Sequence, residues 1–271
     1  MHLVCLLTFA ALTTLNPMRQ ATHLHRDPTR LTSYFQGGSV MRSRSVSDIV
    51  LSAVLDVPAP SGRLMADWER EVSARLGLEP GDVEPLPLTR ARARWPDYKY
   101  CVQAASDWTR AIGLEEVIAT SDIALMACRG ARYHHDGAQY GGAAFCNLFL
   151  SEDKGLDVHF PVSGHRIPLV RGTVLVFDTG QPHAVIRRDR GGFNAADFAS
   201  DLDCTQVFLT WELPIENIDV ARALGVDFDI EPSIASRLEE EQVWWNDAPM
   251  SVCPESGTCQ LPMGVGGAHG K

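Results

Sequence analysis

Two histidines and one aspartate in the middle of the chain have the types and spacing of a metal-binding set. His134 and Asp136 lie two residues apart, and His183 follows the strongly β-prone run from Thr173 to Phe177. Successive side chains of a β-strand point to opposite faces, so His134 and Asp136 share a face and His135 points to the other. Two imidazoles and one carboxylate form the facial triad that holds non-haem Fe(II) and leaves coordination positions open for substrate chemistry. We therefore predict an Fe(II) site at His134, Asp136 and His183; the alternative interpretation is three polar side chains at exposed strand ends.

Eight short β-prone segments surround these residues. Glycine and proline occupy the gaps between them, as is typical of strands joined by turns. Eight short strands at this spacing favour an all-β core of the double-stranded β-helix or jelly-roll type, as in cupin-like enzymes. The barrel is expected to cover residues 121–213, with strands at 122–128, 131–136, 143–150, 156–160, 166–170, 173–178, 183–188 and 205–213.

Flanking α-helices are expected on both sides of this barrel. Apolar residues recur at helical spacing, and the predicted helices are 45–57, 63–77, 101–113, 216–225 and 231–245. Val243, Trp244 and Trp245 of the last helix are expected to pack on the outside of the barrel, because aromatic rings bury large apolar areas.

The two ends of the chain differ in composition from the rest. Residues 1–44 combine a short apolar run, Val4 to Leu12, with a polar stretch rich in Arg, His, Ser and Thr, and Met41 resembles a natural start. We predict a leader or a disordered segment there. Residues 251–271 are rich in Gly, Pro and Ser and predict a flexible tail. The remaining residues, 45–250, are expected to form a single domain.

One connection is unusually long. Residues 189–204 separate the last two predicted strands and follow His183 closely in the sequence. Long loops in compact domains are often functional, so this segment is either a lid over the metal site or a variable surface insertion.

The charge and cysteine content narrow the classes of partner. The net charge is -10, and an acidic surface repels phosphate backbones, so no nucleic-acid partner is expected. The one basic cluster, Arg90, Arg92 and Arg94, is interpreted as a solvated loop or helix end. The apolar run near the start is far shorter than the roughly 20 residues that span a bilayer, so no membrane partner is expected. Seven cysteines without a CxxC pair favour a reducing compartment and hence a cytoplasmic protein.

Segments that include the predicted ligands resemble one enzyme family in their order and spacing. They are YHHDG, CNLFLSED, GLDVHFP, IPLVRGTVLVF followed by QPHAV, and TQVFLTWEL. Over residues 121–213 the chain is similar to the Fe(II)/2-oxoglutarate-dependent oxygenases, and especially to their prolyl-4-hydroxylase-like branch. The resemblance implies a hydroxylase that binds Fe(II), 2-oxoglutarate and O₂. Such an enzyme converts 2-oxoglutarate to succinate while it oxidises a C–H bond of a small-molecule, amino-acid or peptide substrate.

The chain departs from this family at the residue that binds the distal carboxylate of 2-oxoglutarate. The resemblance implies Arg or Lys at the start of the last strand, where this chain has Thr205-Gln206, and Phe149 stands where close relatives often have Tyr. Arg187 and Arg188 are the nearest candidates. Alternation from His183 places Arg187 inward and Arg188 outward, so Arg187 is the predicted anchor. The alternative is a solvated strand end at both arginines, with three further candidates for the anchor: Lys154, Arg166 and Arg171.

Two other functions are compatible with the pattern. A cupin-type metalloenzyme that does not use 2-oxoglutarate would present an HxH pair followed by Glu, a spacing that HHDGAQYGG lacks. A metal-free jelly-roll binding module would need none of the three ligands. Iron content and succinate release distinguish the three functions.

Overall fold

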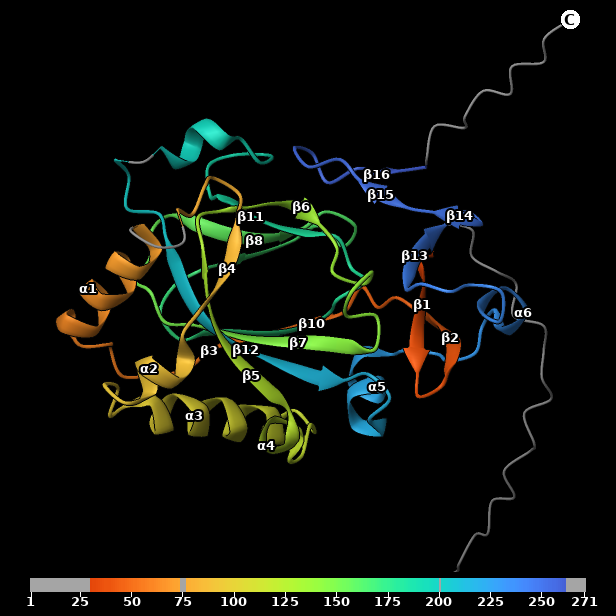
Figure 1. Ribbon diagram of the computed structural model, residues 1–271, viewed down its shortest axis with the longest axis horizontal. Coiled ribbons are helices and arrows are strands. Elements are labelled where there is room, and N and C mark those ends of the chain that lie inside the picture. Colours follow the sequence, from red (N-terminus) through yellow and green to blue (C-terminus); the bar gives the residue numbers. More distant parts are fainter. Residues whose placement is uncertain (1–29, 74–76, 200, 262–271) are drawn as a thin grey trace, which may run out of the picture.

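The computed structural model describes residues 30–73, 77–199 and 201–261, and most of its regular structure is antiparallel β-sheet (Figure 1). Two sheets form the centre of the molecule, and together they contain all eight strands expected from the sequence. The larger sheet has the order β3-β10-β7-β12-β5-β4, with β3 (Val50–Val54), β10 (Thr173–Asp178), β7 (Ala143–Phe149), β12 (Gln206–Pro214), β5 (Asp122–Cys128) and β4 (Val83–Leu86). The smaller has the order β6-β11-β8-β9, with β6 (Ala131–His134), β11 (His183–Arg187), β8 (Leu156–Phe160) and β9 (His165–Pro168).

The two central sheets pack face to face, and aromatic rings fill part of the space between them. Phe149 and Phe208 of the larger sheet stack with ring centroids 4.9 Å apart, and Phe177 meets Phe160 of the smaller sheet at 5.3 Å. All four side chains are buried. Burial of one such side chain stabilises the fold by about 1.5–3 kcal/mol, so this layer holds the sheets together.

Helices cover the opposite face of the larger sheet (Figure 1). Ser61 caps α1 because its hydroxyl accepts a hydrogen bond from the Leu64 amide. Trp68 of α1 meets Trp95 edge-on, with ring centroids 5.4 Å apart. Among the described residues, no helix has the length and apolar character needed to cross a bilayer. The covering helices are α1 (Gly62–Glu71), α2 (Leu88–Arg92), α3 (Tyr98–Ala111), α4 (Val117–Thr120) and α5 (Ile218–Leu224), which confirms the helices predicted at 101–113 and 216–225 and the start of that predicted at 63–77.

A third sheet joins the two ends of the described chain and corrects the prediction for residues 1–44. Within that segment β1 and β2 form a hairpin, β1 also pairs with β13, and Tyr34 and Phe35 are fully buried. Composition carries no sign of this arrangement, because the partner strand lies near the other end of the sequence. Residues 1–29 lie outside the described part. The sheet has the order β14-β13-β1-β2, with β14 (Ala248–Pro249), β13 (Gln242–Trp245), β1 (Thr32–Gly37) and β2 (Val40–Ser45).

Two predicted helices are wrong. Within residues 45–57 the structure has strand β3, which pairs with β10 at the edge of the larger sheet. A short apolar run fits either a strand or a buried helix. Here it forms a strand, because its backbone can pair with the free edge of β10. Of the helix predicted at 231–245, only the single turn α6 (Pro232–Ala235) forms, and Gln242–Trp245 is β13. Val243 therefore packs with Leu31 and Val46 of the third sheet's own small core instead of docking from a helix.

The predicted flexible tail at 251–271 is ordered over its first part. β15 (Ser251–Val252) and β16 (Cys259–Gln260) form a short hairpin. The turn between them is fixed to β6 of the smaller sheet, because the Tyr133 amide donates a 3.0 Å hydrogen bond to the Pro254 carbonyl. Backbone hydrogen bonds of this kind override a Gly- and Pro-rich composition. Residues 262–271 lie outside the described part.

Replacing Phe35 by alanine is expected to lower the free energy of unfolding by about 3–5 kcal/mol, the usual cost of removing a buried aromatic side chain. Its ring is fully buried and lies 6.3 Å from that of Phe228, measured between centroids. Urea unfolding followed by circular dichroism measures the change. Val40→Ala in the same hairpin is the control, since Val40 is 59% exposed and its loss should cost less than about 0.5 kcal/mol. Equal stability of the Phe35 variant and the wild type would show that this hairpin is not part of the cooperative fold.

Candidate metal centre

The three predicted ligands meet at one end of the smaller sheet. His134 ends β6 and His183 begins β11, and the two residues are direct partners in the antiparallel register. Asp136 lies in the turn after β6, and its two carboxylate oxygens are each 3.5 Å from the Nε2 atom of one histidine. The ligand atoms of all three residues lie within 4.8 Å of one another. One cation can therefore be bound from one side by two imidazoles and a carboxylate.

Backbone carbonyls fix which nitrogen of each histidine faces the site. The Nδ1 atom of His134 lies 2.7 Å from the Arg132 carbonyl, and that of His183 lies 3.0 Å from the Gln181 carbonyl. A carbonyl oxygen only accepts hydrogen bonds, so Nδ1 carries the proton in both rings. The Nε2 lone pairs are then free for a metal, as is usual for metal-binding histidines.

His183 is held in its neutral form. Burial lowers the pKa of its imidazole most, the nearby His134 also lowers it and Asp136 opposes the shift, which leaves the pKa at about 4. The ring packs against Phe177 and Phe160, with centroid distances of 4.8 and 5.9 Å. A neutral imidazole is the form that binds a metal, so at neutral pH this ligand needs no deprotonation.

The space between the sheets also contains polar atoms without partners. Asn147 and Thr210 are direct neighbours on β7 and β12, and the buried Oδ1 and Oγ1 atoms of these two side chains have no hydrogen-bond partner among the described residues. Gln206 is fully buried, and within the described part of the chain its side-chain Nε2 and Oε1 atoms both lack a hydrogen-bond partner. Buried polar groups almost always have partners, so these atoms fit a polar ligand or water between the two sheets. The Thr210 hydroxyl can donate a hydrogen bond to such a ligand, whereas the Asn147 Oδ1 atom can only accept one.

Sequence reasoning did not single out Asn147 and Thr210, although a signal was present. Asn147 is the one polar side chain on the inward face of AAFCNLFL, and Thr210 shares the inward face of QVFLTW with the polar Gln206 and with Phe208. An isolated polar residue on the buried face of a strand is costly unless it binds something. A single polar residue on the apolar face of a predicted strand therefore marks a candidate ligand-binding residue.

Arg187 lies on the inward-facing side of β11. It is four residues beyond His183, and its register partner Leu156 belongs to the core between the sheets. The side chain is 35% exposed, and its Nε atom is 3.5 Å from the Oδ1 atom of Asp189. Among the residues that the structure describes, the guanidinium thus has one weak ionic partner, and it retains donors for a carboxylate.

Arg188 faces the other side of the strand and is fully engaged there. Its Nε atom donates to Asp157 at 2.8 Å, and its two terminal nitrogens donate to Asp153, each at 2.9 Å. These hydrogen bonds raise the pKa of the Arg188 guanidinium. The geometry makes Arg188 a brace between β11 and the 153–157 segment.

The three further anchor candidates are also engaged with acidic partners. Lys154 binds Asp203 and donates to the Thr205 carbonyl at 2.8 Å. The Nε atom of Arg166 lies 3.3 Å from Asp157, and its terminal nitrogens donate to the carbonyls of 187, 188 and 190. Arg171 pairs with Glu152. Arg187 therefore remains the predicted anchor.

The long connection at 189–204 does not cover the metal ligands. Within it, η2 (Ala195–Phe198) packs on the turn between β5 and β6: the Arg129 guanidinium donates to the Phe198 carbonyl at 2.9 Å. A Cβ atom at Gly130 would lie only 2.5 Å from the Phe198 ring. Gly130 and His134 lie at opposite ends of β6. The described part of the segment therefore packs at the far end of that strand, which favours the alternative of a surface insertion over a lid.

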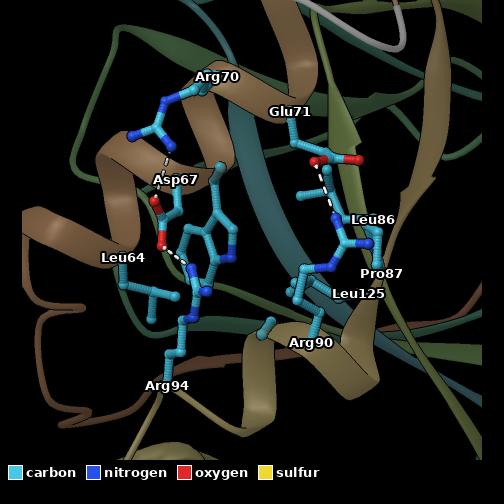
Figure 2. Close-up of a pocket in the computed structure, with 11 residues that line it drawn as sticks. Leu64, Asp67, Arg70, Glu71, Leu86, Pro87, Arg90, Arg94 and Leu125 are labelled. Carbon is cyan, nitrogen blue, oxygen red and sulfur yellow. Dashed lines mark hydrogen bonds and ion pairs between the residues drawn. The ribbon is translucent and has the colours of Figure 1, made fainter.

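A separate cavity of about 360 Å³ lies on the helical side of the larger sheet, away from the three ligands (Figure 2). Leu64, Leu86 and Leu125 contribute to its apolar lining. Figure 2 shows Asp67 between Arg70 and Arg94, at 3.2 and 3.0 Å, and Glu71 facing Arg90 at 3.7 Å. Arg92, the third member of the basic cluster noted in the sequence, lies over the Tyr98 ring at 4.9 Å. Each arginine of that cluster thus has an intramolecular partner.

Comparison with known proteins gives matches among solved structures alone. No family model and no curated protein matches the chain. A prolyl-4-hydroxylase of Pseudomonas putida is 19% identical, over 61% of this chain and 92% of its own, with a TM-score of 0.36. A prolyl 4-hydroxylase of Phytophthora capsici is 15% identical, over 59% and 56%, with a TM-score of 0.33. EvdO2 of Micromonospora carbonacea var. aurantiaca is 13% identical, over 61% and 86%, with a TM-score of 0.35. At these values the matches do not assign the chain to a family.

Proposed function

We propose that this protein is a non-haem Fe(II)-dependent oxygenase that uses 2-oxoglutarate and O₂ to hydroxylate an organic substrate. The observation that carries the proposal is the convergence of His134, Asp136 and His183, whose ligand atoms lie within 4.8 Å of one another. Two histidines and a carboxylate on one side of a metal leave positions open for a cosubstrate and O₂. The substrate class that fits the resemblance is a small molecule, an amino acid or a peptide.

The order of the strands supports a double-stranded β-helix as the scaffold. From β5 to β12, consecutive central strands alternate between the larger and the smaller sheet, except that β8 and β9 are neighbours in the smaller one. Eight antiparallel strands divided in this way between two facing sheets form a jelly roll. The ligands then lie at one mouth of the barrel.

The residues around the centre have separable roles in this proposal. Fe(II), when bound by the three ligands, supplies the activation of O₂ and of the oxoacid. Neutral His183 binds without releasing a proton, and the Phe160 and Phe177 rings keep water from its buried side. The Thr210 hydroxyl, whose oxygen has no partner among the described residues, donates a hydrogen bond to the cosubstrate within the barrel. Arg187 pairs with its distal carboxylate, since a planar guanidinium matches a carboxylate with two parallel hydrogen bonds.

Succinate release tests the proposal directly. The purified protein is loaded with Fe(II) without oxygen, then mixed with 2-oxoglutarate, air and a metabolite extract. We expect succinate to form and a product heavier by one oxygen atom to appear. Stoichiometric iron binding without any consumption of 2-oxoglutarate would contradict the proposed reaction and favour a cupin-type metalloenzyme. Absence of iron binding would favour a metal-free binding module.

A further inference from the structure

A fully buried ion pair lies next to the candidate metal centre. Arg44 of β2 and Asp178 at the end of β10 both have 0% side-chain exposure. Two terminal nitrogens of Arg44 donate to the two oxygens of Asp178, at 2.6 and 2.9 Å. Removing two charges from water costs more than their attraction usually returns, so a buried ion pair is weak evidence for a stabilising role. The position of this pair is better explained by a role in holding the turns around the metal centre in place.

The Asp178 side of the pair organises the turn that leads to His183. The Asp178 carboxylate accepts hydrogen bonds from the amides of Ser47 and Gly180, at 2.9 and 2.8 Å. Its backbone carbonyl accepts from the Gln181 amide at 3.0 Å. The Gln181 carbonyl in turn accepts from Nδ1 of His183. A continuous series of contacts therefore links the Arg44 guanidinium to the orientation of the His183 ring.

The same guanidinium also holds the turn that carries Asp136. The Nε atom of Arg44 donates to the Gly141 carbonyl at 2.8 Å. The turn from 136 to 141 is closed by the Tyr140 amide, which donates to the Asp136 carbonyl at 2.9 Å. It is tied to the 178–183 turn because the Asp136 amide donates to the Thr179 carbonyl at 2.8 Å. Arg44 thus contacts both turns whose spacing sets the distance between Asp136 and His183.

We propose that Arg44 is a positioning residue that sets the two metal-bearing turns at their binding distance before a metal arrives. The proposal rests on the metal site proposed above. Residues that orient metal ligands from outside the coordination sphere typically change metal affinity by about 10–100-fold when they are replaced. We expect loss of the Arg44 contacts to weaken metal binding by a factor in that range.

A neutral double variant separates positioning from stability. Arg44→Met/Asp178→Asn removes both charges at once, so no unpaired charge stays buried. Co(II) replaces Fe(II) as a stable probe, and its dissociation constant is measured by calorimetry. Urea unfolding of the metal-free protein gives the stability. We expect Co(II) binding to weaken about 10–100-fold, while the urea midpoint of the metal-free protein changes little.

Arg42→Met is the matched control. Arg42 lies on the same strand, and its guanidinium binds Asp229 and Glu216, neither of which belongs to the metal-bearing turns. This variant should bind Co(II) as the wild type does. Wild-type Co(II) affinity in the folded double variant would overturn the proposal.

A second variant keeps the test informative if the double variant does not fold. Arg44→Lys retains a charge opposite Asp178 but loses the planar fork that reaches Asp178 and Gly141 together. We expect hydrogen exchange of the Asp136 and Gly180 amides in the metal-free protein to speed up by at least about tenfold, while Arg42→Met leaves it unchanged. Unchanged exchange in Arg44→Lys would overturn the proposal. A wild type that binds no Co(II) would instead contradict the proposed metal site, and the exchange rates would still report on the Arg44 contacts.

Discussion

Asp136→Ala is expected to lower Fe(II) affinity by more than about 100-fold, because losing a ligand costs more than losing a residue that merely orients one. Asp136 is the single carboxylate of the group and contacts the Nε2 atoms of both histidines. The two remaining imidazoles carry no negative charge to offset the charge of the cation. Metal content after dialysis and calorimetric titration measure the loss, and succinate formation should fall with it.

Asp107→Ala is the control for this experiment. Asp107 is an exposed carboxylate on α3 that pairs with Arg110 at 2.9 Å, three residues along the same helix. Removing it takes away a carboxylate of similar size at a site remote from the ligands, so iron binding should not change. Wild-type iron content in Asp136→Ala would show that the metal site lies elsewhere.

Arg187→Ala is expected to raise the concentration of 2-oxoglutarate needed for half-maximal succinate formation by about 100-fold. Breaking a buried charge pair costs about 3–5 kcal/mol. The Arg187 side chain is 35% exposed, so solvent screens part of that cost. A remaining loss of about 2.7 kcal/mol in the binding free energy of 2-oxoglutarate corresponds to about a 100-fold loss of affinity. Iron binding should persist, because Arg187 is not among the grouped ligands.

Arg188→Ala is the control that distinguishes loss of the 2-oxoglutarate anchor from a general effect of removing one positive charge. Its guanidinium is bound to Asp153 and Asp157 on the opposite side of the strand, so its loss should leave the 2-oxoglutarate requirement unchanged. A higher 2-oxoglutarate requirement in Arg188→Ala together with an unchanged requirement in Arg187→Ala would contradict the assignment of the two arginines to opposite faces of the strand. If both variants behave as the wild type does, the anchor is another cation, and Lys154, Arg166 and Arg171 are the next to replace.

The strands of the barrel could be predicted because each carries a local signal. Thr173 to Phe177 is β-branched or aromatic at most positions, and β10 covers this run. The convergence of His134, Asp136 and His183 could also be predicted, although the reason was partly wrong. β6 ends at His134, so Asp136 reaches the site from a turn held by the Thr179 carbonyl and not through strand alternation. Spacing alone could not reveal that difference, because the holding contact comes from a residue far along the chain.

The third sheet could not be predicted, for a related physical reason. Tyr34 and Phe35 are apolar in a polar neighbourhood, which by itself suggests no partner. Their strand is stable because β13 supplies the missing hydrogen bonds from near the other end of the chain. Arg44 was overlooked in the same way, since its role depends on Asp178 and Gly141, which are distant in the sequence.

The third sheet also has a consequence for the order of events during synthesis. Glu241 accepts hydrogen bonds from the amides of Gln36 and Gly141, and its partner Gln36 is 205 residues earlier in the chain. A ribosome adds about 5–20 residues per second, so the first strand waits on the order of ten seconds or more for this contact. During that interval the nascent chain already contains His134, Asp136 and His183 without the sheet that braces the turns around them. Under the proposed metal site, we therefore expect tight metal binding only from a chain that contains β13, and we expect a product terminated before β13 to carry the three predicted ligands but bind a metal poorly.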